Sequence, residues 1–276
     1  MTALLAEQTT AEGRIFNDVV ALLLRQREEN VDSALAQLHA ELDAIYNGKS
    51  GNIDYAACQM GLAMINFGLG DHAEAKRYAC NALQIGGYAE FVAANAVILF
   101  SNMGELDLAH SHALAVAKRF HSHVEVLEQV SSVLVDALDF DASADCQETM
   151  LKLVTDAAER EMISIRGDRL RSLAAHAKDM GYSASALRAR AQCAIDALRD
   201  AKQNVFVIQL KGTQPSSLAL EFHVGADIEA CAELNFVVAD ALVQKFDDTA
   251  VDFVTMSVHA YAGAPRSTDI WSEVHA

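Results

Sequence analysis

Four histidines lie close together in one stretch of the chain, and histidine is the commonest metal ligand in proteins. The tripeptide His-Ser-His occurs twice, as His110 with His112 and as His121 with His123. Four imidazole nitrogens would satisfy the tetrahedral coordination of zinc. Whether they can meet around one ion depends on the elements that carry them.

A repeat surrounds these histidines. In each of three copies a glycine is followed, at the fifth position after it, by an alanine, and one constant interval separates the first two copies. The glycines are Gly70, Gly104 and Gly181, and the alanines are Ala75, Ala109 and Ala186. Glycine ends a helix where a left-handed backbone is needed, and alanine allows the following helix to approach closely. The pattern predicts helical hairpins.

With its period of about 34 residues the chain resembles the tetratricopeptide repeat, whose unit is a helix–turn–helix of that length. The resemblance covers roughly residues 56–200, with two copies in strict register and the third out of phase. It implies a solenoid of antiparallel hairpins whose first helices line a concave groove for a peptide or a helix. Residues 124–138 and 144–157 are expected to form another helix pair, with irregular spacing and no glycine.

The expected hairpins separate the histidines. His110 and His112 lie on a second helix, where residues two apart point about 200° away from each other. His121 and His123 fall at the break before the next unit, so the helix does not run on to bring the pairs together. We therefore predict solvated surface histidines, and neither a metal site nor a cofactor.

The resemblance assigns an apolar floor to the groove. Aligned with the family, its residues are Met60, Met64, Phe67, Phe91 and Ile98. Methionine suits adaptable contacts because its side chain is flexible. The alternative is that these side chains pack against neighbouring helices or against the chain's own termini.

A basic end is expected beside this floor, because residues 150–202 carry 10 Lys and Arg against 7 Asp and Glu in a chain of net charge -17. Arg171 and Lys178 would face the groove and orient an amphipathic partner with an acidic flank. The alternative is that these charges neutralise the acidic remainder of the protein by surface ion pairs.

After Lys202 the periodicity changes. Residues 204–210 and 218–224 have strand patterns, residues 227–246 form an amphipathic helix, and residues 251–261 return to strand. We therefore predict a helical repeat domain over residues 1–202 and a small α/β domain over residues 203–276, in the order strand, strand, helix, strand. The exposed edges of so small a sheet predict a homodimer through this second domain.

The composition of the chain excludes some classes of partner and of cellular location. The acidic charge argues against nucleic acid as a partner, and no apolar run approaches the ~20 residues of a membrane span. With no signal-peptide pattern and five dispersed cysteines, we expect a cytoplasmic protein with reduced thiols.

No phosphate loop or nucleophile elbow is present, and we predict no catalytic residue. The sequence favours a non-catalytic protein-binding scaffold over an enzyme whose active site lies at the junction of the two domains. Within the second domain, Glu221, His223, Asp227 and His259 offer acid–base groups.

Overall fold

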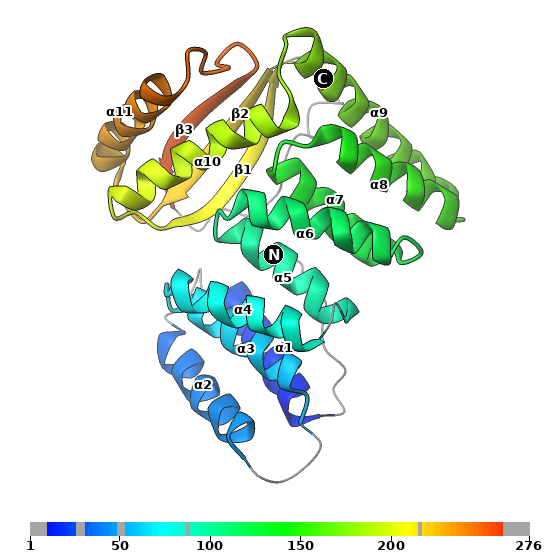
Figure 1. Ribbon diagram of the computed structural model, residues 1–276, viewed down its shortest axis with the longest axis vertical. Coiled ribbons are helices and arrows are strands. Elements are labelled where there is room, and N and C mark those ends of the chain that lie inside the picture. The colour runs from blue at the N-terminus through cyan, green and yellow to red at the C-terminus, as the bar shows by residue number, and fades with distance from the viewer. Residues whose placement is uncertain (1–9, 26–30, 49–52, 87–88, 215–216, 262–276) are drawn as a thin grey trace. The chain divides into compact units, whose positions relative to one another are not determined.

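The computed structural model of the chain describes residues 10–25, 31–48, 53–86, 89–214 and 217–261, and these residues form eleven helices and three strands (Figure 1). The chain divides into two compact units, residues 1–103 and residues 104–276. In the described residues, none of the helices combines the length and the apolar character needed to cross a membrane.

The first unit is entirely helical in its described residues. Its helices are α1 (Ala11–Arg25), α2 (Asp32–Tyr46), α3 (Tyr55–Gly68), α4 (His72–Gly86) and α5 (Glu90–Asn102). Helix α3 packs against all four of the others. It contains no charged residue and is buried without interruption from Ala56 to Asn66. A helix that is apolar on every side must lie inside its unit, and α3 is the centre of this one.

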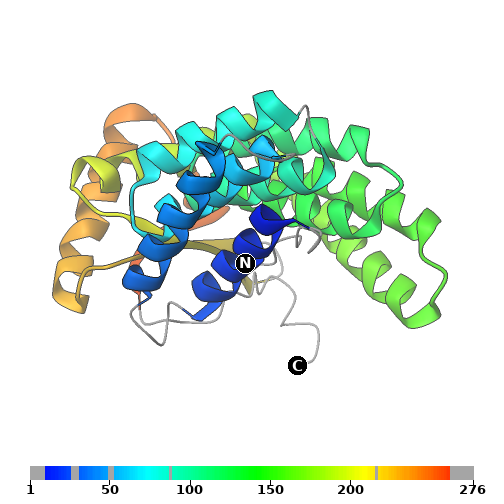
Figure 2. The ribbon, with the colours of Figure 1, turned by 90° about the horizontal axis from the view of Figure 1, so that it is seen from below.

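The second unit continues with hairpin helices and ends in a sheet. Its elements are α6 (Leu106–Arg119), α7 (Val124–Asp136), α8 (Phe140–Leu153), α9 (Ala157–Asp179), α10 (Ala184–Asp200), β1 (Val205–Gln214), β2 (Ser217–Val224), α11 (Ile228–Lys245) and β3 (Val254–Ala260). Figure 2 shows α6 to α9 side by side, each packed on the next. Helix α10 turns away from this row and packs on α11, α6 and β1.

The hairpins share one kind of turn. Gly70, Gly104 and Gly181 have φ values of 81°, 70° and 86°, as expected of glycines that end helices in the left-handed region. Leu138 takes the same conformation, with φ 58°, and it follows Gly104 at the interval that separates Gly104 from Gly70. The α7–α8 pair was expected to be irregular; in the structure it keeps the register of the first two copies, with leucine in the place of glycine.

A serine takes the place of the close-packing alanine in this pair. Ser143 is the fifth residue after Leu138 and is fully buried. Its hydroxyl is 2.8 Å from that of Ser131 on α7 and donates to the Ser131 carbonyl at 2.9 Å. The Gln147 amide donates to the Ser131 hydroxyl at 2.7 Å. Two small residues thus bring α7 and α8 together, and hydrogen bonds satisfy the two serine hydroxyl groups that this buries.

The sheet has the order β1-β2-β3, with β1 and β2 antiparallel and β2 and β3 parallel. Parallel neighbours need a crossover connection, and α11 supplies it between β2 and β3. The even-numbered side chains from Leu218 to Val224 are buried in one core with residues of α9, α10 and α11. The predicted fold class is confirmed: consecutively packed helices are followed by strand, strand, helix and strand. The change of secondary structure at residue 202 lies inside the second compact unit.

Candidate functional site

The predicted apolar floor lies in the first unit, and much of it is internal. Met60 and Met64 on α3 are 0% and 1% exposed. Phe67, Phe91 and Ile98 are half-buried. The two methionines therefore contribute to the core of the unit, as the alternative interpretation of the sequence expected.

Helix α1 covers part of this floor. The ring of Phe16 meets that of Phe91 edge to face, with centroids 5.1 Å apart. Phe16 and Val19 are fully buried, and α1 packs along α3. The Glu12 carboxylate accepts the backbone N–H of Asp54 at 2.9 Å, which ties the start of α1 to the start of α3. A segment of the chain itself thus packs on part of the surface that the resemblance gives to a partner.

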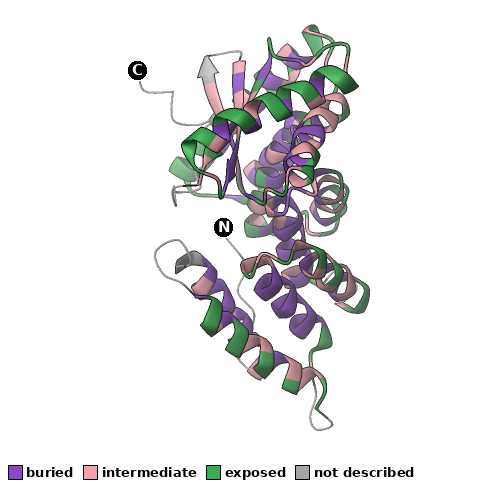
Figure 3. Cartoon of the chain, turned by 90° about the vertical axis from the view of Figure 1, so that its left-hand side faces the viewer, coloured by how far each residue is buried: buried purple, intermediate pink, exposed green. Residues whose placement is uncertain are grey.

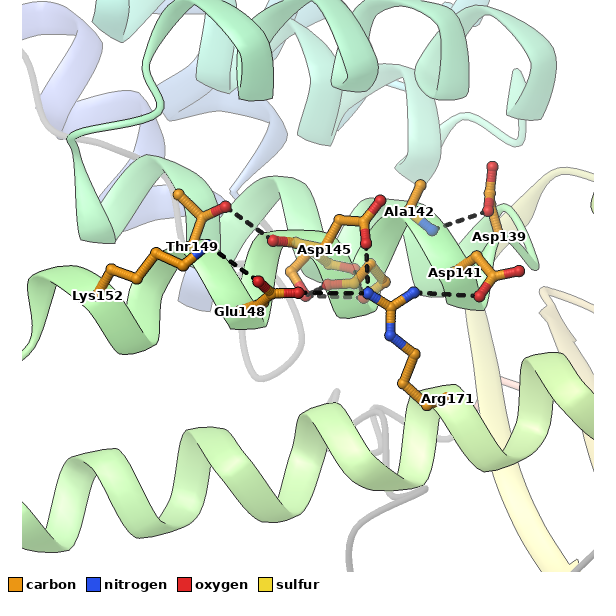
Figure 4. A network of polar contacts seen from close by, with 10 residues as sticks. Asp139, Asp141, Ala142, Asp145, Glu148, Thr149, Lys152 and Arg171 are labelled. Carbon is orange, nitrogen blue, oxygen red and sulfur yellow. Dashed lines mark hydrogen bonds and ion pairs between the residues drawn. The ribbon is translucent and has the colours of Figure 1, made fainter.

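Arg171 on α9 is surrounded by carboxylates of α8 (Figure 4). Its guanidinium contacts Asp141 at 3.2 Å, Asp145 more closely, and Glu148 at 3.7 Å. Glu148 also accepts from Lys152 at 2.9 Å, and this hydrogen bond lowers the pKa of the Glu148 carboxyl. The contacts with Asp145 and Asp141 raise the pKa of Arg171. The charge of Arg171 is therefore neutralised within the chain, and its ion pairs connect α9 to α8.

Lys178, the other predicted basic residue, is exposed in the last turn of α9. A cation there interacts favourably with the carbonyl end of the helix. The structure thus places Arg171 and Lys178 on one helix of the second unit and the five apolar residues in the first unit.

A different face of α9 combines exposed apolar side chains with half-buried cationic ones. Met162 and Ile165 are 54% and 46% exposed, and Arg166 and Arg169 follow at the spacing that puts all four on one side of a helix. We call these four residues the α9 face. Arg166 pairs with Glu128 at 3.4 Å, and the buried Nε of Arg169 has no hydrogen-bond partner among the described residues. The i, i+3, i+4, i+7 spacing of these four residues is visible in the sequence, which predicted the basic segment but not the apolar pair beside it.

Polar side chains from all three strands meet on the sheet face opposite the buried even-numbered residues. Lys211 on β1 donates to Glu221 on β2 at 2.8 Å. The Nε2 atoms of His223 and His259 lie 3.3 and 4.0 Å from the Glu221 carboxylate. Ser257 lies 2.9 Å from His259 Nε2. Burial lowers the pKa of His223, although the Glu221 carboxylate acts in the opposite direction. These five residues form the Glu221 cluster.

The Glu221 cluster differs from a nucleophilic triad. In a triad the histidine holds its acid through one ring nitrogen and activates the serine through the other. Here Nε2 of His259 is the atom nearest both to Ser257 and to Glu221. Lys211 already neutralises the carboxylate at 2.8 Å. Asp227, the fourth acid–base candidate, caps α11 instead by accepting the N–H of Ala230 at 2.8 Å.

The pair His110 and His112 is separated from the pair His121 and His123 as predicted, because α6 ends at Arg119, between the two pairs. His110 is less exposed than predicted, since its Nε2 lies 2.7 Å from the Asp139 carboxylate at the start of α8. Burial lowers the pKa of His112. In the described part of the chain, no group of three or more His, Cys, Asp or Glu residues is arranged to hold a metal ion.

Comparisons of the chain with protein-family models, with curated proteins and with solved structures found no match.

Proposed function

We propose that this chain is a non-catalytic protein-binding scaffold of the tetratricopeptide type, which recognises an amphipathic segment of a partner protein. The repeat geometry supports this proposal, because the turns at Gly70, Gly104 and Leu138 follow one another at equal intervals along the chain. Arrays of this kind present extended surfaces built from successive helices.

The observation that carries the proposal is the α9 face. Single exposed apolar residues are ordinary, but here two large ones lie among arginines in the segment of the chain that is net positive. A partner helix with an apolar stripe and an acidic flank would cover Met162 and Ile165 and pair with Arg166 and Arg169. Arginine suits such a contact because its planar guanidinium binds carboxylates in a bidentate manner.

The experiment compares two variants of the full chain as bait in native-cell extract, with quantitative mass spectrometry. Met162→Asp places a carboxylate on the α9 face, and Leu114→Asp does the same at an exposed residue of α6. We expect a partner that the parent chain and Leu114→Asp both retain and that Met162→Asp loses. Retention should weaken as salt increases, because the rim contacts are ionic. If every protein retained by the parent is retained equally by Met162→Asp, the proposal is wrong.

The second candidate function is acid–base catalysis, which the Glu221 cluster favours by bringing two histidines and a carboxylate together. His223 would be the base, because burial lowers its pKa and so favours the neutral imidazole, which is the form that accepts a proton. A screen of hydrolytic and proton-transfer substrates with the parent chain and His223→Gln tests this. Turnover that His223→Gln removes, with the fold unchanged, would support an enzyme; turnover equal to that of buffer would exclude these reactions.

A further inference from the structure

Helix α11 has two apolar sides. Its inner side, with Cys231, Leu234, Val238 and Leu242, is buried in the core of the second unit. Asn235 fixes this orientation, because its side chain donates to the Val258 carbonyl at 3.2 Å and accepts the Val258 N–H at 2.8 Å. The helix is therefore held against β3 and cannot rotate its other side inward.

The other side remains in solvent (Figure 3). Ile228, Phe236 and Val243 are 81%, 68% and 69% exposed, and the exposed Ala232 and Ala239 lie between them. Each of the five follows the one before it at the third or fourth position, which places all of them on one side of the helix. We call this set the α11 stripe. Scattered exposed hydrophobics need no explanation, but a continuous stripe along a helix marks an interaction site.

The order of side chains along the α11 stripe is nearly symmetric. Ile228 followed by Ala232 at one end mirrors Val243 preceded by Ala239 at the other, with the same spacing in each pair. Phe236 lies next to the midpoint. If two such helices run antiparallel, Ile228 meets Val243 of the other copy and Ala232 meets its Ala239. The large side chains at the ends and the small ones between them would then face matching positions.

From this symmetry we propose that the α11 stripe is the dimer interface of the protein, with a second copy of the chain packed antiparallel on it about a two-fold axis near Phe236. A two-fold contact is formed by the same surface on both copies and must complement itself, which the order of large and small residues does. The alanines let the helix axes come close, and the two Phe236 rings would meet at the centre, where hot spots concentrate. The proposal does not depend on the proposed function, which concerns a different helix.

The charges beside the stripe set the strength of the dimer. Glu229, Glu233 and Asp240 are exposed along one border. In an antiparallel pair this border faces the same border of the other copy, so carboxylates approach one another. One pair of helices also buries less than the ~1,200 Å² of a standard stable interface. We therefore expect a dissociation constant in the micromolar range, about 1–100 µM, that decreases as salt screens the carboxylates.

Sedimentation equilibrium of the full chain measures this association. Phe236→Asp should weaken the dimer by at least about 30-fold, on the scale of losing a central hot spot. Ile85→Asp, at an exposed residue of α4, is the matched control and should leave the dissociation constant unchanged. Circular dichroism and the melting temperature establish that both variants are folded. A chain that is monomeric at about 300 µM, well above the expected range, overturns the proposal.

Cysteine cross-linking tests the arrangement without relying on loss of binding. Phe236→Cys should form a disulfide-linked dimer on mild oxidation, because the two copies meet there. Ala232→Cys and Ala239→Cys should form disulfides with each other when mixed, and neither with itself, since a disulfide needs Cβ atoms about 3.5–4.5 Å apart. Self-linking of Ala232→Cys would indicate parallel helices and contradict the proposal. So would association that weakens as salt is added, because that requires a partner of opposite charge.

Discussion

Two glycines of the second unit allow the cost of a left-handed turn to be separated from the cost of close packing. Gly104 and Gly181 both end first helices, with φ values of 70° and 86°. Among the described residues, a Cβ atom added at Gly181 would meet nothing within 4 Å. A Cβ atom added at Gly104 would lie 2.9 Å from Cγ2 and 3.3 Å from Cδ1 of Ile195, which is fully buried.

Replacing each glycine with alanine should therefore have unequal effects. The left-handed conformation costs an alanine about 1–2 kcal/mol, of which about 0.4–1 kcal/mol is offset by the reduced freedom of the unfolded chain. Gly181→Ala should thus lose about 1 kcal/mol of stability by the same reckoning. Gly104→Ala carries the same strain and in addition displaces Ile195, and overpacking of a core costs about 1–3 kcal/mol. We expect it to lose about 2–4 kcal/mol in total.

Urea unfolding followed by circular dichroism measures both variants against the parent chain, and the melting temperature should decrease by about 2–4 °C per kcal/mol in a unit of this size. Both substitutions lie in the second unit, so the same transition reports both. If the two variants lose equal stability, Ile195 moves aside without cost and the close approach at Gly104 has no energetic weight. If Gly181→Ala loses more, the reasoning from turn geometry fails altogether.

Three further outcomes follow from the structure. Met64→Asp should unfold the first unit, because an unpaired carboxylate in a site that is 1% exposed costs several kcal/mol; a folded variant in circular dichroism would show that Met64 can reach solvent. Arg171→Met should change the free energy of unfolding by no more than about 1 kcal/mol, since the arginine side chain is 44% exposed and surface ion pairs contribute little. Because the pKa of His223 is lowered in the folded chain, the unfolded chain takes up this proton at a higher pH than the folded chain does. The free energy of unfolding should therefore decrease as the pH falls below the ordinary histidine pKa of 6.5, and His223→Gln should flatten this part of the pH profile.

The turns show what the sequence predicts well. Gly70, Gly104 and Gly181 mark helix ends because few other residues accept a positive φ, so this feature is local and visible in the sequence. The turn at Leu138 was not predicted, because Leu138 adopts the same left-handed conformation without being a glycine. The repeat period does identify this turn when it is counted on from Gly104, because the spacing of the turns is unchanged although leucine stands in place of glycine.

The apolar floor shows what the sequence leaves open. Periodicity identifies the face of α3 that packs against another element, but it does not say which element covers that face. Phe16 and Phe91 are far apart in the sequence, and only the folded unit brings their rings together. One sequence signal did favour burial over an open groove: residues 55–70 contain no charge, which is typical of a helix enclosed on every side.

Arg171 illustrates a second limit. Asp141, Asp145 and Glu148 follow one another at helical spacing, so the sequence predicts that they share one side of α8. The cation that these carboxylates face depends on the axial register between α8 and α9, and no local sequence pattern determines that register. The prediction of a basic contact surface therefore named the arginine that the chain neutralises, while the α9 face lies earlier on the same helix.

The α9 face and the α11 stripe differ in charge, and this raises the question of why they should not bind each other. Such a contact would join two different surfaces, so each copy would keep one surface of each kind free and association would continue into open chains. Pairing two α11 stripes closes the assembly at two copies, at the cost of bringing Glu229, Glu233 and Asp240 near their equivalents. The side chains favour closure, because the α9 face offers two large apolar residues and the α11 stripe offers three, and because Arg166 already pairs with Glu128. Salt separates the two arrangements: it should strengthen a closed dimer of acidic borders and weaken an open chain of opposite charges.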